Sequence, residues 1–501
     1  MKFKTLFAAF LTLVLFTTSY SQTLDKTTHK PNKADTQSRF AGARAVIEKM
    51  LLEKQLPSVA VAVVKDGKII WEEGFGWADV ERKIVATAHT PYSLASVTKP
   101  ITATAIMTLN QAGKLDLDAP IEQYLGNLRL KGYAGSTEGV TARRIMAHSA
   151  GLPLYGGFYL NGDKPAGTEQ TISRHGMVVF PPNTRFEYSN VGMKILDAAI
   201  EQVSGQSYGD YLRQHVFLPL GMTRSAVGHD KSWAVKAAVR YEKGKPMSYY
   251  LTDHPGSGDV WSSAHDMALF LAFHMGTPLP DQRQILSRDA VIEMQRPVSA
   301  RSATIGANWF VSKGGGITRI WHGGGQPGVS ASVDFFPDQK LGLVILTNGR
   351  NANLDDIKKA IVDEIAPELT AGLQQTRPDF LPTIPIPTGK WTGTVSNYEG
   401  SEPFMMEFQP DGDIHVYIGN SPPSLLNRKS FDNGALSGTF AGSIKLGQLG
   451  DYRYDMLVKL VPVGDEFVGE LVASVVNEQR AMMLPSFVRI RREAAAPKAG
   501  N

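Results

Sequence analysis

Two pairs of β-rich segments constrain the fold of this 501-residue chain more than any other feature. Residues 58–76 read SVAVAVVKDGKIIWEEGFG, and the Asp-Gly pair between the two apolar runs predicts a β-hairpin. Residues 330–348, SASVDFFPDQKLGLVILTN, predict a second pair of strands, whereas the long segment between the two pairs reads mostly as helices and loops. Helical periodicity adds helices over residues 43–52 and 354–369. Strands at both ends of a helical insertion indicate one α/β domain whose first and last segments share a sheet.

A change of composition near residue 373 predicts a domain boundary. We place the first domain at residues 39–372 and a stiff, proline-rich linker at residues 373–388. Residues 389–493 contain seven or eight short strand patterns joined by Asp-Gly and Gly-Asp turns, which indicates a sandwich or small β-barrel. We expect this β domain to contact the first domain, and residues 494–501 to form a disordered tail.

The N-terminus has the layout of an export signal. A basic start is followed by a short apolar run and small residues, so residues 1–21 predict a signal peptide, with an uncleaved anchor as the alternative. Residues 22–38 predict a linker. We therefore expect a periplasmic or secreted protein, without a stable membrane span once the signal is cleaved. The chain has no cysteine, which rules out disulfides and thiolate metal sites.

The charge balance gives no sign of a polyanionic partner. The formal net charge is +4, and the basic residues are interspersed with acidic ones except near the C-terminus. Nucleic acid is therefore not an expected partner.

The segment YSLASVTKPITATAIM contains a Ser-x-x-Lys pair, Ser96 and Lys99, which occurs once in the chain. On a helix these two positions share a face, so the amine can reach the hydroxyl. Pro100 is tolerated only in a first turn, so the helix should begin within about a turn of Ser96. The serine would then lie near free backbone N–H groups, where an oxyanion can be stabilised. Alone, the pair is weak evidence, and without further support a capping serine with a solvated lysine is the better interpretation.

A second motif, Tyr-x-Asn, occurs at Tyr188 and Asn190, directly before a good helix pattern. A tyrosine whose pKa is lowered by a neighbouring lysine can relay protons, and the Asn amide can orient Lys99 and a substrate carbonyl. Tyr159-Leu160-Asn161 fits the same pattern but lies in a glycine-rich loop, so we favour Tyr188.

The third element is His322-Gly323-Gly324-Gly325, between two strand patterns. Glycines at a strand edge let a substrate backbone approach closely, and the N–H of Gly325 would be a second oxyanion donor. The similar SKGGG run, residues 312–316, is interpreted as a hairpin turn. Neither glycine cluster has the form of a phosphate-binding loop.

Together, Ser-x-x-Lys, Tyr-x-Asn and His-x-Gly resemble the motif triplet of serine hydrolases related to class C β-lactamases and penicillin-binding proteins. The resemblance covers roughly residues 40–370. It implies an antiparallel sheet flanked by helices, with a helical subdomain, in the α/β (α+β) β-lactamase/transpeptidase-like fold. The C-terminal β domain resembles the lipocalin-like barrel appended to some members.

The resemblance also implies roles for single residues. Ser96 corresponds to the nucleophile, Lys99 to its activating base and Tyr188 to a proton shuttle. Asn190 corresponds to the residue that orients the lysine and the substrate amide.

The same resemblance assigns the glycine-rich strand to the pocket. His322, Gly323 and Gly324 would line it, and the backbone N–H groups of Ser96 and Gly325 would form the oxyanion hole. The implied reaction is acyl transfer through an acyl-enzyme, followed by hydrolysis, without a cofactor or metal.

One departure from the family pattern bears on the substrate. Typical class C β-lactamases have Lys-Thr-Gly where this chain has His-Gly-Gly. A lysine carries a permanent charge suited to a β-lactam carboxylate, whereas a histidine is largely neutral at pH 7. We therefore expect a peptidase of the D-amino-acid or carboxypeptidase type, or an esterase, on small peptide, amide or ester substrates, with a β-lactamase as the alternative. Oligomers are possible.

Three other functional classes compete with a serine hydrolase that uses Ser96. The segment AHSAG, residues 147–151, is a near miss to the nucleophile elbow of α/β-hydrolases. A non-catalytic penicillin-binding or sensor protein could use the same fold. A metal hydrolase is set aside because the histidines show no His-Glu-x-x-His spacing.

Overall fold

A computed structural model describes most of the chain after the N-terminal segment. The described residues are 39–53, 55–229, 237–298, 304–350, 353–373, 381–447, 453–477 and 479–493. The predicted signal peptide, the linker that follows it and the C-terminal tail lie outside the described residues, as do residues 374–380 of the proline-rich linker.

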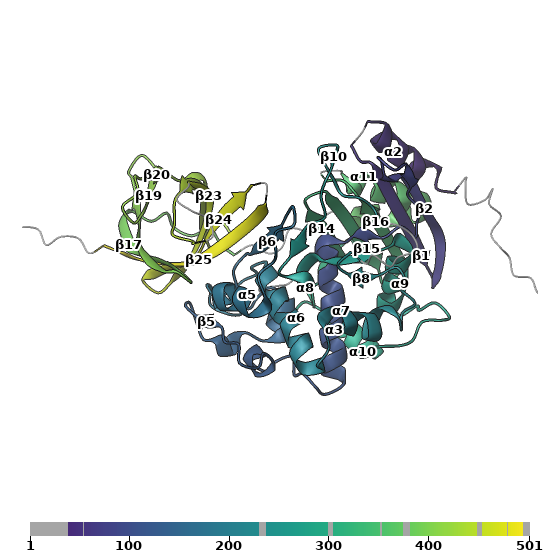
Figure 1. The fold of residues 1–501 in the computed structure, drawn as a ribbon, viewed down its shortest axis with the longest axis horizontal. Helices are drawn as coiled ribbons and strands as arrows, with labels where there is room; N and C mark the ends of the chain where they lie inside the picture. Colours follow the sequence, from purple (N-terminus) through teal and green to yellow (C-terminus); the bar gives the residue numbers. More distant parts are fainter. Residues whose placement is uncertain are drawn as a thin grey trace, which may run out of the picture. The chain divides into compact units, whose positions relative to one another are not determined.

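A seven-stranded antiparallel sheet organises the first domain (Figure 1). In sheet order its strands are β13 (Phe310–Gly314), β14 (Ile317–Gln326), β15 (Val329–Phe336), β16 (Leu341–Thr347), β1 (Ser58–Lys65), β2 (Lys68–Asp79) and β3 (Ile84–Val85). β1 and β2 form the predicted hairpin, whose turn residues Asp66 and Gly67 have positive φ. β1 also pairs with β16, with Val59 opposite Thr347. The prediction that the first and last segments share one sheet is therefore confirmed.

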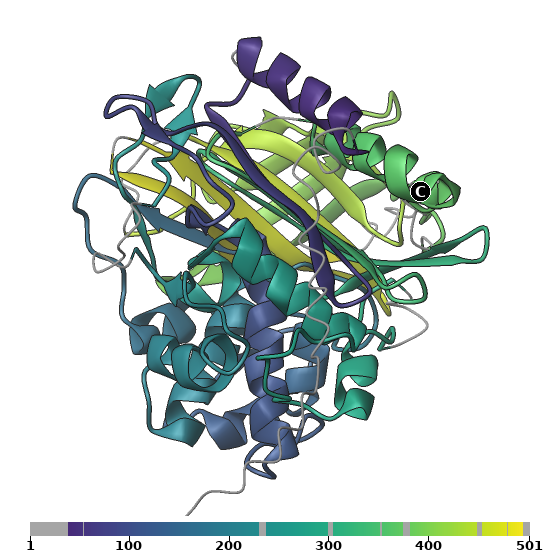
Figure 2. The same cartoon turned by 90° about the vertical axis from the view of Figure 1, so that its right-hand side faces the viewer.

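The central strand β1 is buried on both of its faces. Val59, Val61 and Val63 pack with α2 (Ala41–Leu52) and α11 (Leu354–Ile365), while Ala60 and Ala62 belong to the core on the opposite face. Figure 2 shows α2 and α11 side by side over one face and the larger helical region beyond the other. Burial on both faces explains why the β1 sequence is a continuous apolar run rather than an alternating one.

The segment between β2 and β13 supplies the helical region and several short strands. Its helices are η1 (Ala95–Val97), α3 (Thr98–Gln111), η2 (Ile121–Tyr124), η3 (Thr137–Gly139), α4 (Ala142–Met146), α5 (Thr168–His175), α6 (Asn190–Ser204), α7 (Tyr208–Leu212), η4 (Arg213–Phe217), α8 (Pro255–Gly258), α9 (Ala264–Met275) and α10 (Arg288–Met294). Its short strands are β4 (Tyr92–Ser93), β5 (Lys131–Gly132), β6 (Gly156–Tyr159), β7 (Met177–Val178), β8 (Ala226–Val227), β9 (Tyr241–Glu242), β10 (Lys245–Pro246), β11 (Leu251–Thr252) and β12 (Val260–Ser262). None of the helices in the described part of the chain has the length and apolar character needed to cross a membrane.

The predicted helix over residues 354–369 is wrong at its C-terminal end. α11 ends at Ile365, and a 3₁₀ segment, η6 (Pro367–Leu373), follows. A proline disfavours the α conformation of the residue before it, and Ala366 accordingly adopts φ −160° and ψ 61°.

The C-terminal domain is a nearly closed antiparallel barrel. Among the described residues it has nine strands, one or two more than predicted: β17 (Gly389–Asn397), β18 (Gly400–Phe408), β19 (Ile414–Ile418), β20 (Ser424–Leu425), β21 (Asn427–Ser430), β22 (Leu436–Gly442), β23 (Tyr454–Val463), β24 (Glu466–Val476) and β25 (Arg480–Arg492). The sheet order is β20-β19-β18-β17-β25-β24-β23-β22-β21. Its two edge strands, β20 and β21, follow each other in the sequence, so the sheet curls until its ends meet. Short edge strands on a nearly closed sheet leave few unpaired backbone groups with which another chain could form hydrogen bonds.

The barrel contacts the first domain through backbone and side chains, as predicted. Residues 40–501 form one compact unit, and β25 pairs with β6, with Met483 opposite Gly156. Lys459 on β23 forms an ion pair of 2.6 Å with Glu187, and the backbone N–H of Leu154 donates to Glu470 on β24 at 2.8 Å. One of these contacts, the ion pair at Glu187, lies next to Tyr188 in the sequence.

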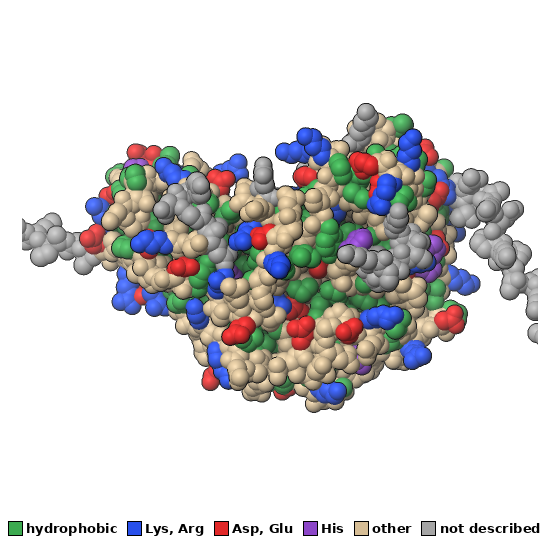
Figure 3. All heavy atoms as spheres, viewed as in Figure 1, with side chains coloured by type: hydrophobic (Ala, Val, Ile, Leu, Met, Phe, Trp, Pro, Cys, Tyr) green, Lys and Arg blue, Asp and Glu red, His purple; other side chains and the backbone are tan. Residues whose placement is uncertain are grey.

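Charged side chains of both signs are interspersed on the face of the molecule in Figure 3. Inside the molecule, one charged cluster anchors α11 to the sheet. Asp334 on β15 accepts from Arg319 on β14 at 2.8 Å, and its second oxygen lies 3.5 Å from Nζ of Lys358 on α11. Arg319 also donates to the carbonyl of Leu373, at the end of η6. Burial raises the pKa of Asp334, but Lys358 and Arg319 outweigh it and hold that pKa below its usual value.

Asp334→Asn should destabilise the protein by about 3–5 kcal/mol, because it leaves two buried cations without their shared anion. Urea-induced unfolding at pH 7 measures this directly. Asp363→Asn, which changes an exposed carboxylate on α11, is the control and should leave the unfolding curve in place. Equal curves for wild type and Asp334→Asn would show that the cluster does not anchor the helix.

Candidate functional site

Ser96 lies in a turn of 3₁₀ helix, η1, that leads directly into α3. α3 begins at Thr98 and Pro100 occupies its first turn, which confirms the predicted position of the helix start. The preceding residue, Ala95, has a φ of 48°, a conformation that is uncommon for a residue with a side chain. Backbone strain of this kind persists only where the surroundings hold it, and it is concentrated at functional sites.

Lys99 is completely buried one helical turn from Ser96. Its Nζ lies 3.2 Å from Oγ of Ser96 and donates a hydrogen bond of 2.9 Å to the carbonyl of Ser257. Burial lowers the pKa of Lys99 well below its ordinary value, because desolvation disfavours the charged amine. The alternative of a solvated lysine is therefore wrong.

Tyr188 lies on the other side of Lys99, whose Nζ is 4.7 Å from the centre of the tyrosine ring. Burial raises the pKa of Tyr188 well above its usual value, and a hydrogen bond with Ser96 only partly offsets this. The expectation that Lys99 lowers the tyrosine pKa is thus wrong. The physical reason is that desolvation of the phenol itself disfavours the charged phenolate and outweighs the interactions that favour it.

The rival Tyr159 lies in a different environment. It is on β6, opposite Arg480 of the barrel, and its hydroxyl donates to buried Asp253 at 3.1 Å. The structure thus brings Tyr188, not Tyr159, to Ser96 and Lys99.

Asn190 is the first residue of α6, and the residue before it, Ser189, caps that helix by accepting from the N–H of Gly192. The amide of Asn190 donates to the carbonyl of Tyr155 at 2.7 Å. This hydrogen bond holds the carbonyl of Tyr155. The role of Asn190 in orienting Lys99 and a substrate stays a prediction.

His322 is buried on β14, and its ring lies beside Phe310. Burial, and secondarily the nearby Lys99, lower the pKa of His322 to about 3, so the imidazole is neutral at pH 7. Its Nε2 is buried without a hydrogen-bond partner among the described residues. The similar SKGGG segment forms the turn between β13 and β14, as predicted, with positive φ at Gly315 and Gly316.

Gly324 allows β14 to lie directly against the backbone that carries Ser96. A Cβ at this position would lie 2.3 Å from the carbonyl oxygen of Leu94 and 3.2 Å from Cβ of Ala95. Gly325, the next residue, has open space where its Cβ would be, and it pairs with Ser330. The oxyanion-hole role of the Ser96 and Gly325 N–H groups stays a prediction.

His148 is a residue of this site that the sequence analysis did not single out. It is buried, and its ring lies 4.4 Å from that of Tyr188. Its carbonyl accepts from the N–H of Glu187 at 2.7 Å, and its Nδ1 accepts from the N–H of Ser189 at 3.1 Å. His148 thereby holds the residues on both sides of Tyr188. The AHSAG segment gave no signal of this, because the contacts are made across forty residues.

The elbow hypothesis for AHSAG is not supported by the local structure. A nucleophile elbow is a sharp turn from a strand into a helix. Here α4 ends at Met146, before the segment, and Ser149 is buried with its hydroxyl directed to the carbonyl of Arg144 at 3.5 Å.

The arrangement therefore places a hydroxyl next to a buried amine of lowered pKa, at the start of a helix. An amine with a lowered pKa can accept the hydroxyl proton at neutral pH, and free N–H groups at the helix start favour a developing negative charge. A second group of titratable side chains, Glu72, His89 and His265, lies elsewhere in the first domain.

Comparisons with known proteins agree with this fold. The beta-lactamase family model matches residues 43–366, more than half of the chain. Protein flp of Staphylococcus aureus (strain MRSA252) is 26% identical over 317 residues, which cover 60% of this chain and 62% of that protein. The chain thus spans about three fifths of the length of the first curated relatives it matches.

Solved structures share the architecture at low sequence identity. The crystal structure of SurE with D-Leu has a TM-score of 0.59 and 22% identity, and the match covers 89% of this chain and 99% of SurE. The class C beta lactamase from Rhodobacter sphaeroides has a TM-score of 0.54 and 20% identity, covering 66% of this chain and 99% of that one. These identities establish the fold alone.

The amine of Lys99 should titrate well below the other lysines. In protein labelled with ¹³C at lysine Cε, one resonance should shift at a pH far under 10.5, and Lys99→Met should remove that resonance. A Lys99 signal that titrates together with those of the surface lysines would contradict the lowered pKa.

Gly324→Ala should destabilise the protein by about 1–3 kcal/mol, because the new methyl group clashes with the Leu94 backbone. Gly325→Ala is the matched control and should unfold like wild type, since its Cβ meets open space. Thermal unfolding of the two variants separates them. Identical melting temperatures would show that β14 does not pack tightly on the Ser96 turn.

Proposed function

Because this chain belongs to the beta-lactamase family, a family of serine hydrolases, we propose that it hydrolyses small peptides, amides or esters through an acyl-enzyme on Ser96. The observation that carries the proposal is the buried amine of Lys99, whose pKa burial lowers, 3.2 Å from Oγ of Ser96. A serine hydroxyl is a weak nucleophile until a base removes its proton. A solvated lysine is protonated at pH 7 and cannot accept this proton. Desolvation favours the unprotonated amine, which has a free electron pair to accept it.

The proposed acylation uses residues that lie together in the site. Lys99 accepts the hydroxyl proton while Oγ of Ser96 attacks the substrate carbonyl carbon. The tetrahedral oxyanion is held by the backbone N–H groups of Ser96 and Gly325, and Asn190 orients the substrate amide. His322, Gly323 and Gly324 line the pocket.

Tyr188 completes the proposed proton path. Since burial keeps the pKa of Tyr188 high, it acts as a neutral phenol, within hydrogen-bonding reach of Ser96. It donates to the leaving group and recovers its proton from protonated Lys99. The acyl–Oγ bond of the intermediate is then broken by water, whose proton follows the same path in reverse.

The neutrality of His322 favours a peptide or ester substrate over a β-lactam. With a pKa of about 3, His322 supplies no positive charge for a β-lactam carboxylate at the position where class C β-lactamases carry lysine. A D-amino-acid peptide is the preferred peptide class, and the shared fold of SurE, which was crystallised with D-Leu, is consistent with it. β-Lactam hydrolysis is the alternative. We place this activity outside the cytoplasm on the basis of the N-terminal sequence.

A hydrolysis panel on the mature protein tests the proposal. It contains p-nitrophenyl esters, a chromogenic cephalosporin, D-Ala-D-Ala peptides, and D- and L-amino-acid amides. Turnover of esters or D-peptides should fall by at least about 1000-fold in Ser96→Ala, as expected for loss of a nucleophile.

Ser149→Ala is the matched control, since Ser149 is a buried serine near the site that the mechanism does not use, and it should retain activity. Dominant cephalosporin turnover would overturn the substrate assignment, and undiminished turnover in Ser96→Ala would overturn the mechanism. Absence of any acylation of the wild type would favour a binding or sensor protein.

A further inference from the structure

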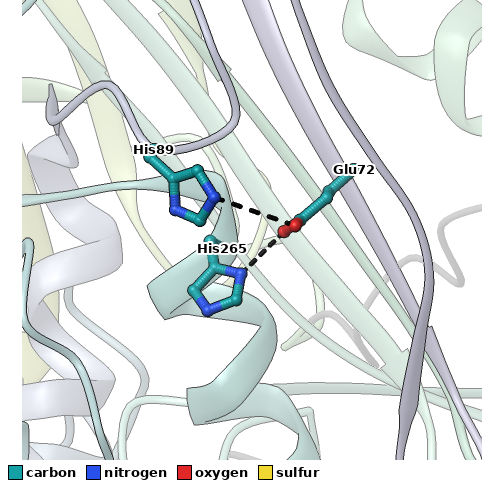
Figure 4. A group of neighbouring side chains, drawn as sticks. All are labelled: Glu72, His89 and His265. Carbon is teal, nitrogen blue, oxygen red and sulfur yellow. Dashed lines mark hydrogen bonds and ion pairs between the residues drawn. The ribbon is translucent and has the colours of Figure 1, made fainter.

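Two histidines and a glutamate converge on the sheet face that α9 covers (Figure 4). Glu72 lies on β2, His89 lies in the loop between β3 and β4, and His265 lies in the first turn of α9. One ligand atom from each side chain lies within 4.8 Å of the other two. Nδ1 of His265 is 2.7 Å from Oε2 of Glu72, and Nε2 of His89 is 3.9 Å from Oε1 of Glu72.

The fold holds these three elements together at the backbone. Gly74, which points to the same face of β2 as Glu72, has no side chain, and a Cβ there would lie 2.4 Å from Cα of Thr87. The loop that carries His89 can therefore lie directly on β2. The N–H of His265 donates to the carbonyl of Ala88 at 3.1 Å, which ties the same loop to α9.

Further hydrogen bonds shape the loop around His89. The N–H of Thr87 donates to the hydroxyl of Thr90 at 2.9 Å, and the N–H of His89 donates to the hydroxyl of Thr87 at 3.2 Å. The rings of His89 and His265 are 4.6 Å apart and inclined at 44°, so they do not stack face to face. Both imidazoles instead present a nitrogen to one carboxylate, as Figure 4 shows.

The geometry points to a binding site for a divalent transition-metal ion, and we propose that Glu72, His89 and His265 bind Zn²⁺. Two imidazoles and a carboxylate form a donor set that zinc uses in proteins, with a fourth position left for water. The sequence has no cysteine to supply a thiolate ligand, and two imidazoles do not form the all-oxygen site that magnesium or calcium prefers.

Metal binding requires a small contraction of the site. Ligand atoms at about 2.0–2.1 Å from zinc in a tetrahedron are roughly 3.4 Å apart, compared with the present upper limit of 4.8 Å. The side chain of His89 is half exposed, so it can rotate toward the other two ligands without disturbing the core. Binding also displaces the proton that Nδ1 of His265 shares with Glu72.

The position of the site suggests a structural role beside the Ser96 turn. β4 follows His89, and Ser96 is seven residues further along the chain. A bound ion would join β2, α9 and this segment. Three strands separate β2 from β14, so the axes of these two strands lie about 19 Å apart at the usual strand spacing. The metal would therefore not be part of the proposed reaction centre.

Zinc binding to untagged, chelator-treated mature protein at pH 7.5 tests the inference. Isothermal titration with Zn²⁺ should show one equivalent bound, and thermal unfolding should shift upward with added Zn²⁺. Co²⁺ should give the visible absorption of a four-coordinate site. Glu72→Gln and His89→Ala should each weaken the zinc affinity by at least about tenfold and abolish the thermal shift.

Two variants control for other binding. His415→Ala removes a histidine of the barrel, and Ser96→Ala removes the proposed nucleophile, so both should bind Zn²⁺ like wild type. Unchanged binding in Glu72→Gln and His89→Ala, or no equivalent bound by wild type, would overturn the inference and leave the cluster as an ion pair. Because Ser96→Ala retains the site, this test is independent of the proposed hydrolysis.

Discussion

The burial of Lys99 beside Ser96 determines the electrostatics of the whole site. An isolated charge in this position would be costly, and the pKa of Lys99 falls accordingly. The same burial lowers the pKa of His148 and His322 and raises that of Tyr188. His148, His322 and Tyr188 are therefore uncharged near neutral pH, and burial shifts Lys99 toward its neutral form. Burial thus disfavours charge on each of these side chains, and fixed backbone donors are most effective where a charge has to develop in such surroundings.

The position of this cluster depends on contacts between segments that are far apart in the sequence. β14 can approach the Ser96 turn only because Gly324 has no side chain, and β14 is placed by a sheet that pairs β16 with β1. On the opposite side, His148 holds the residues that flank Tyr188. The strained φ of Ala95 is compatible with this arrangement, since the carbonyl of Leu94 and the side chain of Ala95 are both packed against Gly324.

The sequence predicted the parts of this protein that depend on local pattern. The β1–β2 hairpin, the start of α3 and the shared sheet follow from turn chemistry, from Pro100 and from the distribution of strand patterns. The features that depend on tertiary contacts were missed or misjudged. The burial that raises the pKa of Tyr188 comes from tertiary packing. The hydrogen bonds that His148 accepts on either side of Tyr188 join residues about forty positions apart in the sequence. Likewise, Glu72, His89 and His265 have no motif spacing, because a strand, a loop and a helix bring them together only in the fold.

The barrel contacts the segment that carries Tyr188. Glu187, the residue before Tyr188, pairs with Arg185 at 2.5 Å and with Lys459 of the barrel. Burial raises the pKa of nearby Glu470 on β24 to about 7, with Lys459 opposing the shift and Glu187 adding to it. Glu470 also accepts from the N–H of Leu154, next to the Tyr155 carbonyl that Asn190 holds. A displacement of the barrel would therefore be transmitted to both ends of the Tyr-x-Asn motif. The contacts between the barrel and this region thus run through the backbone N–H of Leu154 and the side chain of Glu187.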